Sequence, residues 1–259
     1  MRHTPREVLP VWGIEVTPMN SSEIVTWVGS RPGERSLLLN HNLHSAYLSL
    51  VDPNFAEAYA LADRTIIDGF PILLLANRYR AGRGEAALPA DYRCGSNDWI
   101  AHFGALPDGH RVALLGASPS SNAAAVDELA ARFSHLTFRG WDGFAGVADL
   151  EAADFLALRE FGPDLVLVGL GMPKQEAFIV RNWDRLPQAL YATVGGAIDQ
   201  ISGEQKLAPR WLGKLRAEWL WRLVSDPRRL SHRYIVEPIL LLRETQRRRS
   251  RSASLNESR

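Results

Sequence analysis

The feature that most constrains this chain is a regular alternation of short apolar runs and amphipathic stretches between residues 35 and 200. The runs have the length of buried strands, and the stretches between them repeat their apolar residues with a helical period. The strands are expected at 35–40, 65–68, 110–118, the start of 136–146, 164–171 and 189–196. This order predicts an α/β fold, a Rossmann-like and mainly parallel sheet with helices on both faces.

Helices are expected between these strands. They are predicted at 45–64 in two parts divided near Pro53, at 70–79, at 120–133, at 150–162 and at 174–186. After Gly203 the strand-like runs stop, and the chain reads as helices interrupted at Pro227 and Pro238. We therefore expect a catalytic domain over 1–203, a helical basic appendage over 204–248, and a disordered polar tail over 249–259.

Charge is unevenly distributed, although the formal net charge is only +1. Between Lys206 and Arg251 basic residues far outnumber the acidic ones, which are Glu218, Asp226, Glu237 and Glu244. A basic end with several tryptophans favours an anionic membrane surface as its partner. A solvated helical face is the simpler alternative. Nucleic acid is not expected, because no familiar groove-reading module precedes this segment.

The cysteine content and the hydropathy of the chain indicate its compartment. The single cysteine, Cys94, excludes an internal disulfide framework and is expected to be an inert core thiol. Residues 1–20 contain no apolar stretch of signal-peptide length, and no run approaches the ~20 apolar residues that cross a bilayer. The chain is therefore expected to be cytoplasmic, or peripheral at a membrane.

Ligands of an open parallel sheet bind beyond the carboxyl ends of its strands. That rule selects the residues directly after the apolar runs, which are Asn40, His41, Asn42, Asp68, Gly69, Gly116, Ala117, Ser118, Gly169 to Gln175 (including Gly171), Gly195 and Gly196. They offer a carboxylate, amides and glycines whose backbone can approach a ligand closely. The set favours a nucleotide or another phosphorylated ligand, although tight turns and helix caps explain the same glycines.

Two carboxylates compete for a catalytic role at this edge. Asp68 directly follows a predicted strand and is a candidate general base, although an Asp before Gly is commonly a turn residue. Asp199, three residues after Gly196, is the rival. The chain has no Asp-x-Asp pair to bridge a diphosphate through a divalent ion. This absence, with only His41 and His44 close together, favours arginines and helix N-termini over a metal.

The segment LVLVGLGMPKQEAF (165–178) raises the question of a dinucleotide site. Its strand, Gly169-Leu170-Gly171 turn and following helix begin like that fingerprint, but Lys174 stands where the third glycine is required. A dinucleotide-dependent oxidoreductase is therefore a second hypothesis. A third is a non-enzymatic, membrane-docked nucleotide-binding protein.

Several motifs resemble one enzyme family over roughly residues 10 to 243. GLGMPKQEAFI (169–179), VGGAIDQISGEQKLAPRWL (194–212) and EWLWRLVSDPRRLSHRY (218–234) are similar to motifs of the WecG/TagA/CpsF glycosyltransferases, family 26. NHNLHSAYL, IIDGFPI and YRCGSNDWI fit the same pattern upstream.

The resemblance implies a definite reaction. It implies an inverting, metal-independent transfer from a UDP-sugar to a polyprenyl-diphosphate-linked saccharide, at the inner face of the cytoplasmic membrane. The product would belong to a cell-surface polysaccharide or exopolysaccharide. The sugar is left open among N-acetylmannosamine, its uronic acid, glucose and other hexoses, and self-association of the chain is also left open.

The resemblance also implies residue roles. The family's general base falls on Asp68, and the polar residues after the first strand fall on Asn40 and Asn42, with Asn40 in place of the usual Thr. Gln175 would be a ligand of the donor sugar. Diphosphate-binding arginines would be Arg93, Arg222, Arg228, Arg229 and Arg233.

Overall fold

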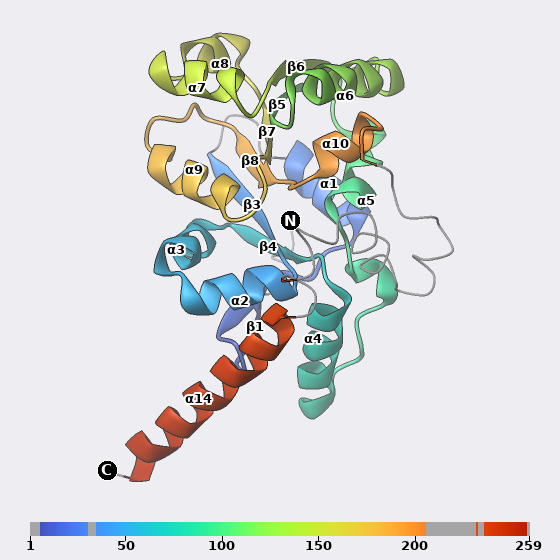
Figure 1. Ribbon diagram of the computed structural model, residues 1–259. Helices are drawn as coiled ribbons and strands as arrows, with labels where there is room; N and C mark the ends of the chain where they lie inside the picture. The colour runs from blue at the N-terminus through green and yellow to red at the C-terminus, as the bar shows by residue number, and fades with distance from the viewer. Residues whose placement is uncertain (1–5, 31–34, 206–231, 233–235, 258–259) are drawn as a thin grey trace.

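The centre of the molecule is a six-stranded, fully parallel sheet with strand order β4-β3-β8-β7-β5-β6 (Figure 1). A computed structural model of the chain describes residues 6–30, 35–205, 232 and 236–257. The strands are β3 (Ser36–His41), β4 (Arg64–Ile67), β5 (Arg111–Gly116), β6 (Thr137–Trp141), β7 (Leu165–Gly169) and β8 (Leu190–Thr193). The Rossmann-like sheet expected from the alternating pattern is thus confirmed.

Helices cover both faces of this sheet, also as expected. One face carries α1 (Ser21–Gly29), α5 (Ser96–Ile100), the short helix η2 (Phe103–Ala105), α6 (Pro119–Arg132) and α10 (Ala197–Ile201). The other carries α3 (Pro53–Leu61), α7 (Ala145–Ala152), α8 (Leu156–Phe161) and α9 (Lys174–Asn182). The remaining elements around the edge are β1 (Glu7–Leu9), β2 (Ile14–Val16), α2 (Leu43–Val51), α4 (Phe70–Gly82), η1 (Ala90–Tyr92) and α14 (Glu237–Glu257).

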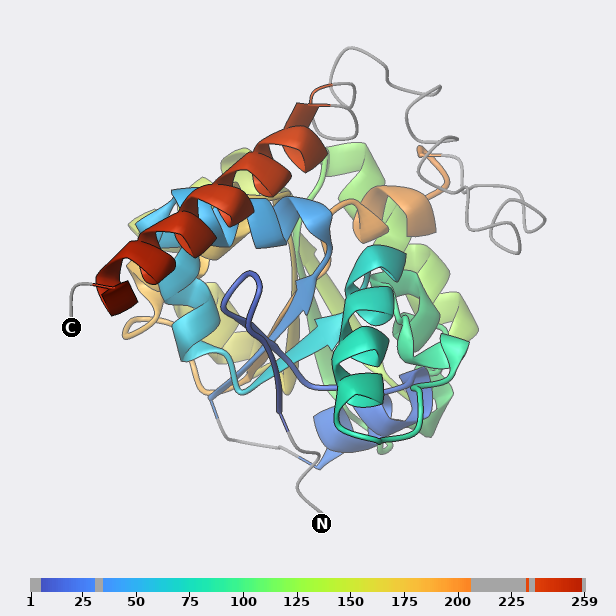
Figure 2. The same ribbon diagram turned by 90° about the horizontal axis from the view of Figure 1, so that it is seen from below.

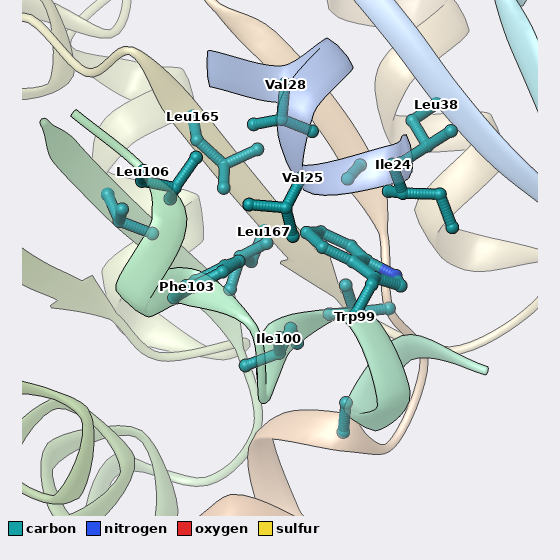
Figure 3. Packing of buried hydrophobic residues seen from close by; sticks show 14 of the residues in the cluster. Ile24, Val25, Val28, Leu38, Trp99, Ile100, Phe103, Leu106, Leu165 and Leu167 are labelled. Atoms are coloured by element: carbon teal, nitrogen blue, oxygen red, sulfur yellow. The ribbon is translucent and has the colours of Figure 1, made fainter. Parts of the chain in front are cut away.

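The central strands β5, β7 and β8 are mostly apolar because both faces of the sheet are buried there, whereas the edge strand β6 is partly exposed. Alternate residues divide between two cores: Leu38 and Leu167 pack on one face, whereas Leu39 and Val166 pack on the other. Figure 3 shows Leu38 and Leu167 in the first core, close to Trp99. Side chains that follow the strands keep this alternation.

A third, smaller core lies beside the sheet edge. The antiparallel hairpin of β1 and β2 buries Leu9 and Val16 against Ile67 and against Ile72 and Leu73 of α4. The sequence pattern did not predict this hairpin. Each strand is only three residues long, which is too short for an alternating pattern to stand out.

One of the predicted helical breaks is confirmed, and one predicted helix needs correction. The break near Pro53 is confirmed, since Asp52 caps the N-terminus of α3 and Pro53 is its first residue. The stretch 150–162, expected as one helix, is divided between α7 and α8, because Asp154 and Phe155 both have positive φ. Left-handed residues of this kind cannot continue a right-handed helix.

The expected disorder of 249–259 also differs from the structure, in which α14 continues to Glu257. Pro238 interrupts nothing, because it lies in the first turn of α14, where proline is tolerated. Figures 1 and 2 show α14 lying along α2. Once this docked part of the helix is nucleated, adding residues to its end costs little.

Candidate active site

The carboxyl ends of the neighbouring strands β3 and β4 bring Asn42 and Asp68 together. Asn42 Nδ2 donates a hydrogen bond to Asp68 Oδ2 at 3.1 Å. Asn42 is also the N-cap of α2, and its Oδ1 accepts from Ser45 N at 3.1 Å. Because the cap uses the amide oxygen, the NH₂ group is directed toward the carboxylate. The structure therefore holds the predicted general base through one oxygen.

The second oxygen of Asp68 faces Gly95. A Cβ atom at Gly95 would lie 3.0 Å from Asp68 Oδ1, and so the glycine makes room at this carboxylate. The segment is held against β4, since Cys94 N donates to Ile67 O at 2.7 Å. Arg93, expected to bind diphosphate, lies beside Asp98, with Nη2 3.7 Å from Oδ2. Thus Arg93 and Asp68 belong to the same corner of the sheet edge.

Asn40 presents a buried acceptor. Its Nδ2 donates to Thr193 O at 3.1 Å, which links the ends of β3 and β8. A carbonyl only accepts, so this bond fixes the orientation of the amide, with Oδ1 on the other side. Oδ1 is buried without a hydrogen-bond partner among the described residues. A buried, unpaired acceptor of this kind suits a hydroxyl or amide hydrogen of a ligand.

Beneath the site lies a neutral buried network. Burial lowers the pKa of His41 to about 3, and its Nδ1 lies 3.0 Å from Ser45 Oγ. The His41 ring stacks on Tyr59, whose hydroxyl donates to Asn40 O at 2.7 Å. Burial raises the pKa of the Tyr59 phenol, so it remains a neutral donor. This network supports the end of β3 and was not predicted from the sequence.

No cluster of three or more metal-ligating side chains occurs within the described residues. His41 bonds to Ser45, as above. His44 instead contacts the C-terminal helix, its Nδ1 lying 2.5 Å from Glu237 Oε2. The two histidines that stand close together in the sequence therefore have separate partners.

The glycine-rich loop after β7 is positioned by buried side chains of the following helix. Gly171 has φ +75° and faces open space, so the turn after β7 requires a glycine there. Gln175 in α9 is fully buried; its Oε1 accepts from Gly195 N at 3.1 Å, and its Nε2 donates to Glu176 Oε1 at 2.8 Å. Gln175 thus positions the turn after β8, where Gly195 has φ +54°. These contacts give Gln175 a positioning role, and its contact with the donor sugar stays a prediction.

Gly116 serves the packing of two strands. A Cβ atom there would lie 2.3 Å from Gly169 O, so a larger residue would separate β5 from β7. The Gly116 carbonyl accepts from Asn122 Nδ2 at 2.9 Å. This reason for a glycine, the close approach of two strands, differs from the ligand contact and from the turns or caps considered from the sequence.

Asp199 is likewise engaged by the scaffold. Its Oδ1 accepts from Ser121 Oγ at 2.7 Å, which ties α10 to the first turn of α6. Glu204 Oε1 accepts from Ser120 Oγ at 2.7 Å in the same turn. Carboxylates are stabilised at a helix N-terminus by its dipole. Asp199 is thus used to join two helices, whereas Asp68 is paired with Asn42 through Oδ2 and has Gly95 beside its Oδ1.

The C-terminal chain returns to this site. Arg222, Arg228, Arg229 and Arg233 lie outside the described residues. Glu237, which directly follows that region, contacts His44 and, at 3.4 Å, His232 Nδ1. Farther along α14, Thr245 Oγ1 accepts from Trp12 Nε1 at 3.0 Å. Because His44 is in the first turn of α2, two residues after Asn42, α14 begins beside the candidate site.

Some of the supporting residues had a signal in the sequence and others had none. Gly95 stands in the CGSND stretch that carries the resemblance, and its role follows from its closeness to Asp68. Tyr59 and Glu237 lie in ordinary helical stretches, and only the folded chain brings them to β3 and α2. Cys94 is buried, and burial raises its pKa to about 12, in line with an inert thiol.

Comparison with known proteins agrees with this geometry. A model of the "Glycosyl transferase WecG/TagA/CpsF family" matches residues 9–254. The chain is 27% identical over 188 residues to an N-acetylglucosaminyldiphosphoundecaprenol N-acetyl-beta-D-mannosaminyltransferase of Staphylococcus aureus strain MRSA252, covering 73% of this chain and 68% of that protein. The corresponding protein of strain MW2 matches to the same extent. Neither comparison supports an oxidoreductase or a non-enzymatic protein. The family match covers most of the chain, which is therefore a glycosyltransferase of the WecG/TagA/CpsF family.

Proposed function

We propose that this chain transfers N-acetylmannosamine, or a closely related hexose, from a UDP-sugar to a saccharide linked to polyprenyl diphosphate. The observation that carries the proposal is the Asn42–Asp68 pair at the carboxyl edge of the sheet, in a chain of this family. The names of the Staphylococcus aureus relatives support both the sugar and an N-acetylglucosaminyl-diphosphate-lipid acceptor.

Asp68 acts as the general base in a single displacement. The acceptor hydroxyl attacks the anomeric carbon of the donor, its proton passes to the Asp68 carboxylate, and UDP departs with the electrons of the broken C–O bond. Attack opposite the leaving group inverts the anomeric configuration. Asn42 orients the carboxylate through Oδ2, and Asn40 Oδ1 accepts a hydrogen bond from a sugar hydroxyl or amide.

Arginines neutralise the departing diphosphate. Arg93 lies in the same corner as Asp68, and Arg222, Arg228, Arg229 and Arg233 supply further positive charge. A charge-assisted hydrogen bond contributes about 1.5–3 kcal/mol, and several of them stabilise a leaving group without a metal ion. The lack of an Asp-x-Asp pair in the sequence supports this choice.

The basic C-terminal part works at an anionic membrane surface, on the inner face of the cytoplasmic membrane. The outer side of α14 exposes Ile239, Leu242, Arg243 and Arg247, with 51% and 61% of the two apolar side chains accessible. Exposed apolar residues beside cations suit the headgroup region of a bilayer. Among the described helices, none is both long and apolar enough to pass through a bilayer.

The experiment is a transfer assay with the full chain, UDP-N-acetylmannosamine and N-acetylglucosaminyl-diphosphate-polyprenol, with EDTA present. We expect a disaccharide-lipid whose new bond has the anomeric configuration opposite to that of the donor, assigned by NMR. Other UDP-hexoses are compared as donors. Absence of transfer with every donor, or retention of configuration, would contradict the proposal.

The Asp68→Asn variant separates an enzyme from a binding protein. Loss of the base should lower kcat by about 10³-fold, while thermal stabilisation by UDP is retained. Stabilisation by NAD or NADP, without any by UDP, would instead revive the oxidoreductase hypothesis.

A further inference from the structure

A groove lies beside α4, on the side of the turn that joins β1 to β2. The cavity has a volume of about 800 Å³ and is lined mainly by Pro10, Val11, Leu75, Arg78, Tyr79 and Gly82. Ligand pockets commonly occupy roughly 300–1,000 Å³. One wall is fixed to the other, since Val11 N donates to the Tyr79 hydroxyl at 3.2 Å. The groove is therefore part of the folded structure.

The helix that forms this groove starts at the candidate base. Phe70, the first residue of α4, lies two positions after Asp68. With a rise of about 1.5 Å per residue, Leu75 lies about 8 Å and Arg78 about 12 Å along the axis from Phe70. Leu75, Arg78 and Gly82 recur at helical spacing and so form one stripe along α4. A ligand along this stripe would extend away from Asp68.

The chemistry of the groove is apolar with one available cation. Leu75 lies in it, and Leu74, next to it, is 60% exposed. Arg83 at the far end is already engaged by Glu85, with Nε 2.6 Å from Oε1. Arg78 is exposed and makes no hydrogen bond or ion pair with any of the described residues. Such a surface suits an amphiphile with an anionic group and a hydrocarbon chain.

We propose that this groove binds the lipid end of the acceptor, with Arg78 on the diphosphate and the first isoprene units along Leu75 and Val11. The inference rests on the proposed function, because only a lipid-linked acceptor places a diphosphate and a hydrocarbon chain next to the reacting sugar. The sugar at Asp68, the diphosphate at Arg78 and the chain beyond it follow the order of these groups in the acceptor. UDP carries a diphosphate but no hydrocarbon chain, so it would not use the apolar part of the groove.

Gly82 permits a variant that fills the groove. A Cβ atom at Gly82 meets nothing within 4 Å, so Gly82→Leu is accommodated, and it favours the helical conformation. The matched control is Gly104→Leu in η2, where a Cβ atom likewise meets nothing within 4 Å. Arg78→Gln removes the charge and keeps most of the side chain, and Arg132→Gln in the last turn of α6 is its control.

The first test measures binding of farnesyl diphosphate to the full chain by calorimetry, with inorganic diphosphate and farnesol as separate probes. We expect farnesyl diphosphate to bind more tightly than either fragment. Arg78→Gln and Gly82→Leu should each weaken it about tenfold, and the two controls should leave it unchanged. The proposal would be overturned if all four variants bound farnesyl diphosphate as tightly as the wild type does. It would also be overturned if inorganic diphosphate bound as tightly as farnesyl diphosphate.

The second test measures KM for the lipid-linked acceptor and for the UDP-sugar. Both groove variants should raise KM for the lipid acceptor about tenfold and leave KM for the donor unchanged. Transfer by the wild type with no effect of the groove variants would overturn the groove and leave the proposed function intact. No transfer by the wild type, with farnesyl diphosphate binding still weakened by the variants, would overturn the function and leave the groove.

Discussion

The two halves of the carboxyl edge of the sheet differ in how their polar groups are used. At the ends of β3 and β4, Asn40 Oδ1 and one oxygen of Asp68 have no hydrogen-bond partner among the described residues. Beyond the ends of β5, β7 and β8, Gln175 binds Gly195 and Asp199 binds Ser121. Thr193 Oγ1, at the end of β8 beside Asn40, is also buried without a partner among the described residues and belongs with the first group. Available acceptors mark the half that meets a ligand, and satisfied ones mark the half that shapes it.

The variant Asn42→Asp tests the reacting half of the edge and should have the largest effect. Aspartate caps α2 as well as asparagine does, so the helix should be retained, while the lost Asn42–Asp68 hydrogen bond and the repulsion between the carboxylates should lower the unfolding free energy at neutral pH. A second carboxylate beside Asp68 makes both hold a proton more tightly, and the acid limb of the pH–rate profile should move up by roughly 1–2 pH units. Turnover near neutral pH should fall at least tenfold. Profiles of the two proteins that coincide would contradict the base assignment.

Gln175→Ala should act on stability. The substitution removes the acceptor of the half-buried Gly195 N–H and the hydrogen bond that Gln175 donates to the buried Glu176 carboxylate. A buried polar group left without its hydrogen-bond partner lowers the unfolding free energy by about 1–3 kcal/mol. Denaturant titration measures this loss. Gln175→Glu tests the same contacts, because its carboxylate can still accept from Gly195 but cannot donate to Glu176. Unchanged stability with a raised KM for the UDP-sugar would instead make Gln175 a substrate ligand.

His41, below the reacting half of the edge, should make the unfolding free energy depend on pH. Its pKa is about 3 in the folded chain, below the usual 6.5, so the unfolded chain binds the extra proton. The stabilising contribution is complete above pH 6.5 and is lost as the pH falls from there toward 3. Between pH 6.5 and 5 the loss is about 2 kcal/mol, at about 1.4 kcal/mol per unit.

His41→Phe is the matched variant for this pH effect, since it retains an aromatic ring on Tyr59. Its unfolding free energy should depend less on pH between 6.5 and 5 than that of the wild type. Parallel curves for the two proteins would show that folding does not change the pKa of His41.

The smallest effect is expected for Ser121→Ala. It removes the hydrogen bond from Ser121 to Asp199 and the contact with Ser202, and it should lower the unfolding free energy by about 1 kcal/mol. Activity should be unchanged once the protein is folded. A large loss of kcat at unchanged stability would move Asp199 into the reacting half of the edge.

The sequence predicted the sheet well, because strands buried on both faces have nearly continuous apolar sequences. It also predicted that Asn42 and Asp68 lie at the carboxyl edge of the sheet, where the structure brings them together. It did not reveal that Gln175 faces inward, because a polar residue early in a helix reads alike whether it binds a ligand or a turn. The hairpin of β1 and β2 and the break at Asp154 depend on contacts and torsions without a clear periodic signal.

The most direct measurement is kcat and the unfolding free energy, determined side by side for Asp68→Asn and Gln175→Ala. We expect Asp68→Asn to lose about 10³-fold in kcat at nearly wild-type stability. Gln175→Ala should lose about 1–3 kcal/mol of stability, with much the smaller loss of kcat. The reverse pattern, with Asp68→Asn active and Gln175→Ala inactive at full stability, would contradict the division between a reacting and a supporting half.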